Sequence, residues 1–156
     1  MPYPLLIFHH MNIPEEFDPI RPFEPEELPE VFERLLANKQ FVHVMGYVLP
    51  QLSAEAFAQT LRSCRTNLDV QKKLAYPFLC GLIAKYCKEM DMNYAAVDNT
   101  KRYTFISNHR DIVLDSAFLD KLLIDSGFTT TCEIAIGDNL LALPWIKDLA
   151  RVNKSF

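Results

Sequence analysis

The stretch FISNHRDIVLD, residues 105–115, decides how the second half of the chain is interpreted. It starts with aromatic and β-branched residues and continues into the polar run Asn108–Asp111. Because such residues favour strands, Arg102–Ser107 is predicted to be a strand that ends where the polar run begins. Ligands of open α/β sheets bind at the carboxyl ends of strands, so this boundary is a candidate functional site.

Helix and strand patterns alternate after this stretch. Apolar residues at helical spacing predict a helix over 114–126, ended by Gly127 in the position after the helix. Thr130–Ile136 is predicted to be a second strand, and 140–152 a last helix that is interrupted near Pro144. A helical connection of about a dozen residues between two strands implies that the strands pair in parallel through a right-handed crossover.

The first half of the chain reads differently. Residues 1–25, rich in proline and acid, are predicted to be an extended arm, and 26–95 a helical segment. Helices are predicted over 26–38, 40–49, 53–64 and 68–90, the last with a kink or break at Pro77. The predicted fold class is therefore α/β, with an N-terminal helical segment followed over 96–156 by the start of a parallel-sheet domain. Two strands alone do not make a stable parallel sheet, so this domain is expected to be incomplete and the chain cut short.

Composition narrows the function classes. The chain has 156 residues and a formal net charge of −4, which argues against a nucleic-acid partner. The four cysteines show no C-x-x-C spacing and no histidine at a metal-ligand interval, so no metal site is predicted. No run approaches the roughly 18 apolar residues of a transmembrane helix, and the expected localisation is cytoplasmic.

The polar run offers a histidine and two carboxylates. Asp111 can cap the following helix, and Asp115 falls on its first turn. A carboxylate beside His109 could hold the imidazole so that its second nitrogen acts as a base. From these residues alone, helix capping is the commoner arrangement, and both interpretations stay open.

The segments FISNHRDIVLDSAFL and EIAIGDNLLALPWIKDLARVNKSF resemble the glycerol-3-phosphate and lysophosphatidate acyltransferases. The first motif of that family is written N-H-x-x-x-x-D, which Asn108 and His109 match, and Arg110 matches the H-R opening of the glycerol-phosphate branch. Position 114 is a leucine here, so Asp115, one residue later, is taken as the motif carboxylate, with Asp111 as the fallback. The run IAIGDN, which ends at Asn139, looks like the AAGDNL segment of the same branch.

The resemblance implies an O-acyltransferase of phospholipid biosynthesis in which His109 is the general base and Asp115 orients it. The acceptor would be the hydroxyl of glycerol 3-phosphate or lysophosphatidate, and Arg110 and Asn139 are candidate substrate-binding residues. Acyl-CoA or acyl carrier protein would be the acyl donor, with no further cofactor and no metal. A membrane surface is a further expected partner, which would make the protein peripheral on the inner face of the membrane.

Two further expectations qualify this assignment. The chain stops before the arginine of the family's second motif, so this chain alone is expected to be inactive. The alternative function is a non-catalytic truncated fragment, or a helical interaction module without activity of its own. Trp145 also fits two interpretations, a packed core position, which we favour, and an anchor at a membrane interface, near the basic residues Lys147, Arg151 and Lys154.

Overall fold

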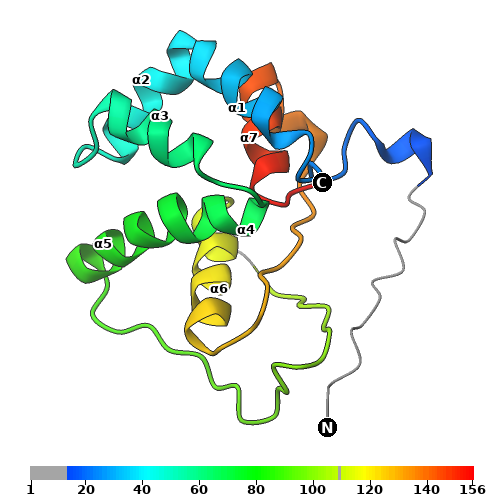
Figure 1. The fold of residues 1–156 in the computed structure, drawn as a ribbon. Coiled ribbons are helices and arrows are strands. Elements are labelled where there is room, and N and C mark those ends of the chain that lie inside the picture. Colours follow the sequence, from blue (N-terminus) through cyan, green and yellow to red (C-terminus); the bar gives the residue numbers. More distant parts are fainter. Residues whose placement is uncertain (1–13, 109) are drawn as a thin grey trace, which may run out of the picture.

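The computed structural model describes residues 14–108 and 110–156, and within these ranges every regular element is helical. The order along the chain is η1 (Glu15–Phe17), α1 (Leu28–Ala37), α2 (Lys39–Val48), α3 (Ala54–Arg62), α4 (Asn67–Val70), η2 (Gln71–Ala75), α5 (Tyr76–Tyr86), α6 (Leu114–Asp125), η3 (Asp138–Leu140) and α7 (Pro144–Val152). Figure 1 shows α1, α2, α3 and α7 grouped together, with α4, α5 and α6 forming a second group beside them.

The predicted α/β fold class, and with it the parallel-sheet domain over 96–156, is wrong. Neither predicted strand forms in the described residues, and the side chain of Ile106 in the first of them is 93% exposed. The segment Arg102–Ser107 has a strand-forming composition but forms no bridge with any other described segment. Composition favours an extended conformation, whereas a sheet also needs partners and cover on both faces.

The second predicted strand does pair, but with a different segment. Ile134 forms a single parallel bridge with Ser155. Its N–H donates to the carbonyl of Lys154 at 3.0 Å and its carbonyl accepts from Phe156 N at 2.9 Å, and Ile136 N donates to the carbonyl of Phe156 at 2.9 Å. The partner of this segment is therefore the stretch that follows α7, and the predicted pairing with 102–107 does not occur.

The core lies among α1, α2, α3 and α7. Leu28, Phe32 and Leu35 on one face of α1 are at most 1% exposed, and Phe41 of α2 packs with them. Apolar residues at this spacing share one helix face, which explains why α1 is the central helix of the group. Val152 of α7 is also 1% exposed, so the last helix completes a core that the first helices begin.

The four helices predicted in the first half form, although the last ends at Tyr86 rather than at 90, and the helix geometry changes just before Pro77, where a kink or break was predicted. The helical run from α4 to α5 contains the π-helical segment η2. At its end Tyr76 N donates to the carbonyl of Gln71, five residues back rather than four. A proline ring clashes with the carbonyl four residues before it, and the widened turn in front of Pro77 relieves this clash.

Helix α6 packs against α5 and ends at Asp125, one residue before the predicted end, with Gly127 in the predicted position after the helix. The hydroxyl of Tyr76 donates to Asp125 Oδ1 at 2.6 Å, and Lys121 forms an ion pair with the same carboxylate. Gly127 has φ +80°, and the N–H of Phe128 donates to the carbonyl of Leu123 at 3.0 Å. This is the Schellman arrangement, in which the left-handed residue after a helix is usually glycine.

The described part of the predicted arm, residues 14–25, is fastened to α7. Arg151 donates to the carbonyl of Arg21 at 2.6 Å and to that of Asp18 at 2.8 Å. Its guanidinium also lies 3.8 Å from the ring centroid of Phe23, which is buried. In Figure 1 this arm lies beside the end of α7. Residues 1–13 of the predicted arm lie outside the described residues.

Candidate functional site

The loop that leads into α6 is organised by the carboxylate of Asp115. Asp115 Oδ2 accepts the backbone N–H of Arg110 at 2.6 Å and that of Asp111 at 3.1 Å. Asp115 lies on the first turn of α6, as predicted, and is half-buried. A side chain of the helix therefore reaches back and holds the two residues that follow position 109.

The carboxylate of Asp111 contacts the start of α6 and not the loop before it. Its Oδ1 accepts the N–H of Val113 at 2.9 Å and that of Leu114 at 2.7 Å, at the start of α6. The N–H groups of Leu114 and Val113 hold the pKa of the Asp111 carboxyl below its usual range. These are the contacts of a helix-capping carboxylate, so of the two candidate aspartates Asp111 is the one occupied with capping.

The other predicted site residues are placed less closely together. His109 lies outside the described residues. Arg110 is exposed in the loop before α6, and Asn139 is exposed in η3. The amide oxygen of Asn139 lies 2.6 Å from the point where a side chain on Gly137 would begin, so Asn139 folds back over this glycine. Among the hydrogen bonds of the described residues, none joins Asn139 to the loop of Arg110–Asp115.

A cluster that the sequence did not point to lies under the middle of α6. Asp120 is 5% exposed, and its carboxylate accepts Gln71 Nε2 at 3.2 Å and the N–H of Cys132 at 2.9 Å. The amide oxygen of Gln71 accepts the hydroxyl of Thr131 at 2.6 Å. The contacts bring together α6, the π-helical segment and the chain that precedes Ile134.

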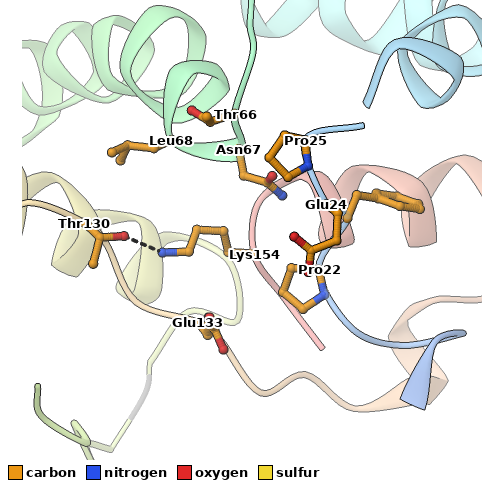
Figure 2. Close-up of a pocket in the computed structure, with 10 residues that line it drawn as sticks. Pro22, Glu24, Pro25, Thr66, Asn67, Leu68, Thr130, Glu133 and Lys154 are labelled. Atoms are coloured by element: carbon orange, nitrogen blue, oxygen red, sulfur yellow. Dashed lines mark hydrogen bonds between the residues drawn. The ribbon is translucent and has the colours of Figure 1, made fainter. Parts of the chain in front are cut away.

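Lys154 extends this cluster. Its Nζ donates to the carbonyl of Thr131 at 2.7 Å, to the hydroxyl of Thr131 at 3.2 Å and to that of Thr130 at 2.9 Å, and Figure 2 shows the last of these contacts. Gln71 Nε2 also approaches Asn153 Oδ1 at 3.3 Å. We call Gln71, Asp120, Thr131 and Lys154 the buried polar network.

Lys154 reaches this place through an unusual backbone conformation. It has φ +62°, which is costly for a residue with a side chain, and it lies two residues after Val152, the last residue of α7. The N–H of Ser155 donates to the carbonyl of Ala150 at 2.9 Å, so Lys154 occupies the position that glycine usually takes. The hydrogen bonds of its ammonium offset the backbone cost.

Burial sets the ionisation of the network. Desolvation raises the pKa of Asp120 to about 6, although the N–H of Cys132 and the charge of Lys154 act in the opposite direction. Desolvation also lowers the pKa of Lys154, against the attraction of Glu133 and Asp120. Among the described residues, every buried side-chain nitrogen or oxygen has a hydrogen-bond partner, so the network is fully satisfied.

A cavity of about 260 Å³ adjoins the network, between the arm, the start of α4 and the segment around Thr130. Figure 2 shows Glu24, Asn67, Glu133 and Lys154 around it. The two carboxylates bring negative charge, and the ammonium of Lys154 is already bound to threonine oxygens. This lining does not favour a phosphate group, so the cavity is not assigned to a phosphorylated substrate.

Trp145 and Arg151 of α7 both make contacts inside the fold. Trp145 packs against the core, with its ring centroid 6.1 Å from that of Phe41, and its Nε1–H donates to Gln40 Oε1 at 3.3 Å. The core position that the sequence favoured for Trp145 is confirmed. Arg151 and Lys154 are both used in internal contacts, so they do not form an open basic surface with Lys147.

The sequence contained one overlooked signal for the network. Asp120 and Lys121 together interrupt the run FLDKLL, in which apolar residues precede and follow the charged pair. A buried carboxylate needs donors, and these come from Gln71 and Cys132, which local spacing does not connect to it.

Within residues 14–108 and 110–156, no group of three or more His, Cys, Asp or Glu side chains is arranged to hold a metal ion. In the same ranges, no helix combines the length and apolar character that a membrane span requires. Comparisons of the chain with protein-family models, with curated proteins and with solved structures find no match.

Proposed function

We propose that this chain contributes to the transfer of a fatty acyl group from a thioester donor to a hydroxyl of glycerol 3-phosphate or lysophosphatidate. The observation that carries the proposal is the carboxylate of Asp115, which accepts the N–H of Arg110, the residue next to His109 in the N-H-R sequence. A histidine base and a carboxylate that orients it are what base-assisted acyl transfer needs. The proposal does not depend on the parallel sheet that the strand and helix patterns predicted.

Each residue has a definite role in this proposal. His109 removes the proton from the acceptor hydroxyl as its oxygen attacks the thioester carbonyl. The C–S bond then breaks, and the imidazolium returns the proton to the departing sulfur, so that the donor leaves as a thiol. Asp115 orients the imidazole and stabilises its charged form, while Asp111 caps α6. The exposed Arg110 offers a guanidinium to the acceptor phosphate, a group that arginine binds through paired hydrogen bonds. Asn139 is a further candidate contact for the substrate.

The test is a thioester-release assay on the protein as the cell makes it, with acyl-CoA or acyl carrier protein as donor and glycerol 3-phosphate or lysophosphatidate as acceptor. His109→Ala should lower kcat by about 100- to 10,000-fold, the usual contribution of a general base. Asp115→Asn should lower kcat within the same range, because the amide keeps the shape of the side chain but cannot stabilise an imidazolium.

Asp111→Asn is the matched control. Asparagine caps helices about as well as aspartate, so this variant should keep the wild-type kcat. If Asp111→Asn loses turnover and Asp115→Asn keeps it, the roles of the two carboxylates are exchanged. Wild-type turnover no greater than that of His109→Ala with either donor would refute the proposed function.

A helical interaction module without activity is the second candidate. The observation that favours it is the all-helical arrangement of the described residues, with a core shared by α1, α2, α3 and α7. The same assay separates the two, because an interaction module shows no dependence of thioester release on the acceptor.

A further inference from the structure

The middle of α6 is held by directed hydrogen bonds to two segments that are distant in the sequence. Gln71 Nε2 comes from the π-helical segment, and the N–H of Cys132 comes from the chain after α6. Both donate to the carboxylate of Asp120, one to each oxygen. Apolar packing alone is not directional, whereas two hydrogen bonds to one carboxylate fix the rotation of the helix about its axis.

This rotation matters for the loop before α6. Asp115 and Asp120 lie on the same twelve-residue helix, with Asp115 on its first turn. Five residues of α-helix span about 7.5 Å, so a small rotation or slide at Asp120 is passed on to Asp115. Asp115 in turn holds the N–H groups of Arg110 and Asp111.

The burial of the carboxylate also points to positioning. Asp120 is 5% exposed, in a place where an apolar residue would pack without a desolvation cost. Lys154, in the segment after α7, is the charged group whose attraction lowers the pKa of this carboxyl. The thiol of Cys132 also lies near the carboxylate. A buried charge with complete hydrogen bonding adds less to stability than to the choice of one arrangement.

We propose that Asp120 is a positioning residue, which fixes the register of α6 on the buried polar network and thereby places the carboxylate of Asp115. The inference rests on the proposed function for its catalytic consequence, but the placement of Asp115 is measurable without turnover.

The first experiment follows the amides of the chain by hydrogen exchange and by NMR at pH 7.5. In Asp120→Ala, the N–H groups of α6, of Arg110 and of Asp111 should exchange at least tenfold faster than in the wild type, and the two loop amides should shift. The amides of α1–α3 should not change. Asp120→Asn, which keeps one acceptor oxygen and the shape of the side chain, provides a second variant that folds if the alanine variant does not.

The second experiment is the thioester-release assay. A misplacement of about 1 Å can cost a hundredfold in rate, so each Asp120 variant should lower kcat by about 100-fold and leave KM for the acceptor unchanged. Leu61→Val serves as the stability control, because Leu61 is a buried core residue of α3 whose apolar side chain makes no hydrogen bond with the network. It should lower the melting temperature without changing kcat.

The outcomes separate the two proposals. Unchanged exchange of Arg110 and Asp111 in a folded Asp120 variant overturns the positioning role, and so does an unchanged kcat. Faster exchange in the variant, together with no turnover in the wild type, supports the positioning role and refutes the proposed function. A fall in kcat in Leu61→Val as large as that in the Asp120 variants also overturns the inference, because it shows a general loss of stability.

Discussion

At the scale of single residues, three aspartates that look alike in the sequence have different structural roles. Asp111 caps α6 from the exposed side, Asp115 holds the loop, and Asp120 is buried between segments. The pKa of Asp111 is lowered by backbone N–H groups, whereas that of Asp120 is raised by desolvation. These opposite shifts lead to opposite effects of pH on stability.

Asp120 should make the folded state less stable as the pH rises. Its pKa of about 6 in the folded protein lies above the usual 3.8, so between these values the folded chain holds a proton that the unfolded chain releases. The stabilising contribution is complete below pH 3.8 and is lost as the pH rises through 6. The shift corresponds to at most about 3 kcal/mol in the free energy of unfolding. Urea titrations between pH 4 and 7 on the wild type and Asp120→Asn measure it.

The comparison has a built-in control. The difference in free energy of unfolding between the wild type and Asp120→Asn should fall as the pH rises. The corresponding difference for Asp111→Asn should rise with pH. The pKa of Asp111 is lower in the folded than in the unfolded chain, so the ionised carboxylate stabilises the folded state at pH values above the unfolded pKa, and this contribution is lost as the pH falls. If the free energy of unfolding depends on pH in the same way in the wild type and in Asp120→Asn, burial does not raise the pKa of Asp120.

The sequence specified some of these residues and not others. The spacing around His109 narrowed the carboxylate to Asp111 or Asp115, but spacing alone could not show which one is used for capping. Asp120 and Gln71 are 49 residues apart, and a contact of that kind leaves no periodic signal in the sequence. Local patterns report on neighbours along the chain, while a buried hydrogen bond depends on which segments meet.

At the scale of elements, helices were predictable and the sheet was not. Apolar spacing marked α1, α2, α3 and α6, Pro77 marked a break, and Gly127 marked an end. A helix satisfies its own backbone, so a local pattern is enough to predict it. A strand forms its backbone hydrogen bonds with another segment, and the local sequence of the strand does not determine which segment that is. The segment around Ile134 therefore bridges to Ser155, and Arg102–Ser107 remains without strand pairing.

The end of α6 offers a test of this local control. Gly127→Ala should lower the free energy of unfolding by about 1–2 kcal/mol, because alanine is strained at φ +80° and its Cβ would lie 3.3 Å from Asn99 Nδ2. Chemical denaturation followed by circular dichroism measures the loss.

Two other glycines provide the controls. Gly46 and Gly81 lie inside α2 and α5, and a Cβ added at either would meet no atom within 4 Å. Alanine at these positions should raise the free energy of unfolding by about 0.5–1 kcal/mol, since it favours helix more than glycine does. A stabilising effect of Gly127→Ala would contradict the left-handed end of α6.

At the scale of the whole molecule, the two ends of the described chain are tied together. Arg34 of α1 forms a two-pronged ion pair with Asp148 of α7, at 2.7 and 2.9 Å. Arg151 of α7 binds carbonyls of the arm and covers the ring of Phe23. Figure 1 shows α7 beside α1 and the arm beside the end of α7, which agrees with these contacts.

Removal of the Phe23 ring should release the arm. Phe23→Ala is expected to lower the free energy of unfolding by about 3 kcal/mol, since a buried ring is lost together with its contact to Arg151. Limited proteolysis should then cut residues 14–25 faster, and urea denaturation measures the loss of stability.

Phe17→Ala is the matched control for this change. Phe17 lies in the same arm but is 43% exposed, so its removal should change the free energy of unfolding by no more than about 0.5 kcal/mol. Equal effects of the two substitutions would show that the arm is not held by Phe23.

The ties between the ends of the described chain also set the order in which the protein can fold during synthesis. Arg34 and Asp148 are 114 residues apart, and Asp18 and Arg151 are 133 apart. Translation proceeds at about 5–20 residues per second, so the segment with α1 waits several seconds for the helix that covers it. During that interval the face of Leu28 and Leu35 lacks Val152 and is open to other nascent chains. The core shared by α1, α2, α3 and α7 should therefore form only after α7 has been synthesised, and a chaperone that binds apolar segments should associate with the chain before α7 emerges.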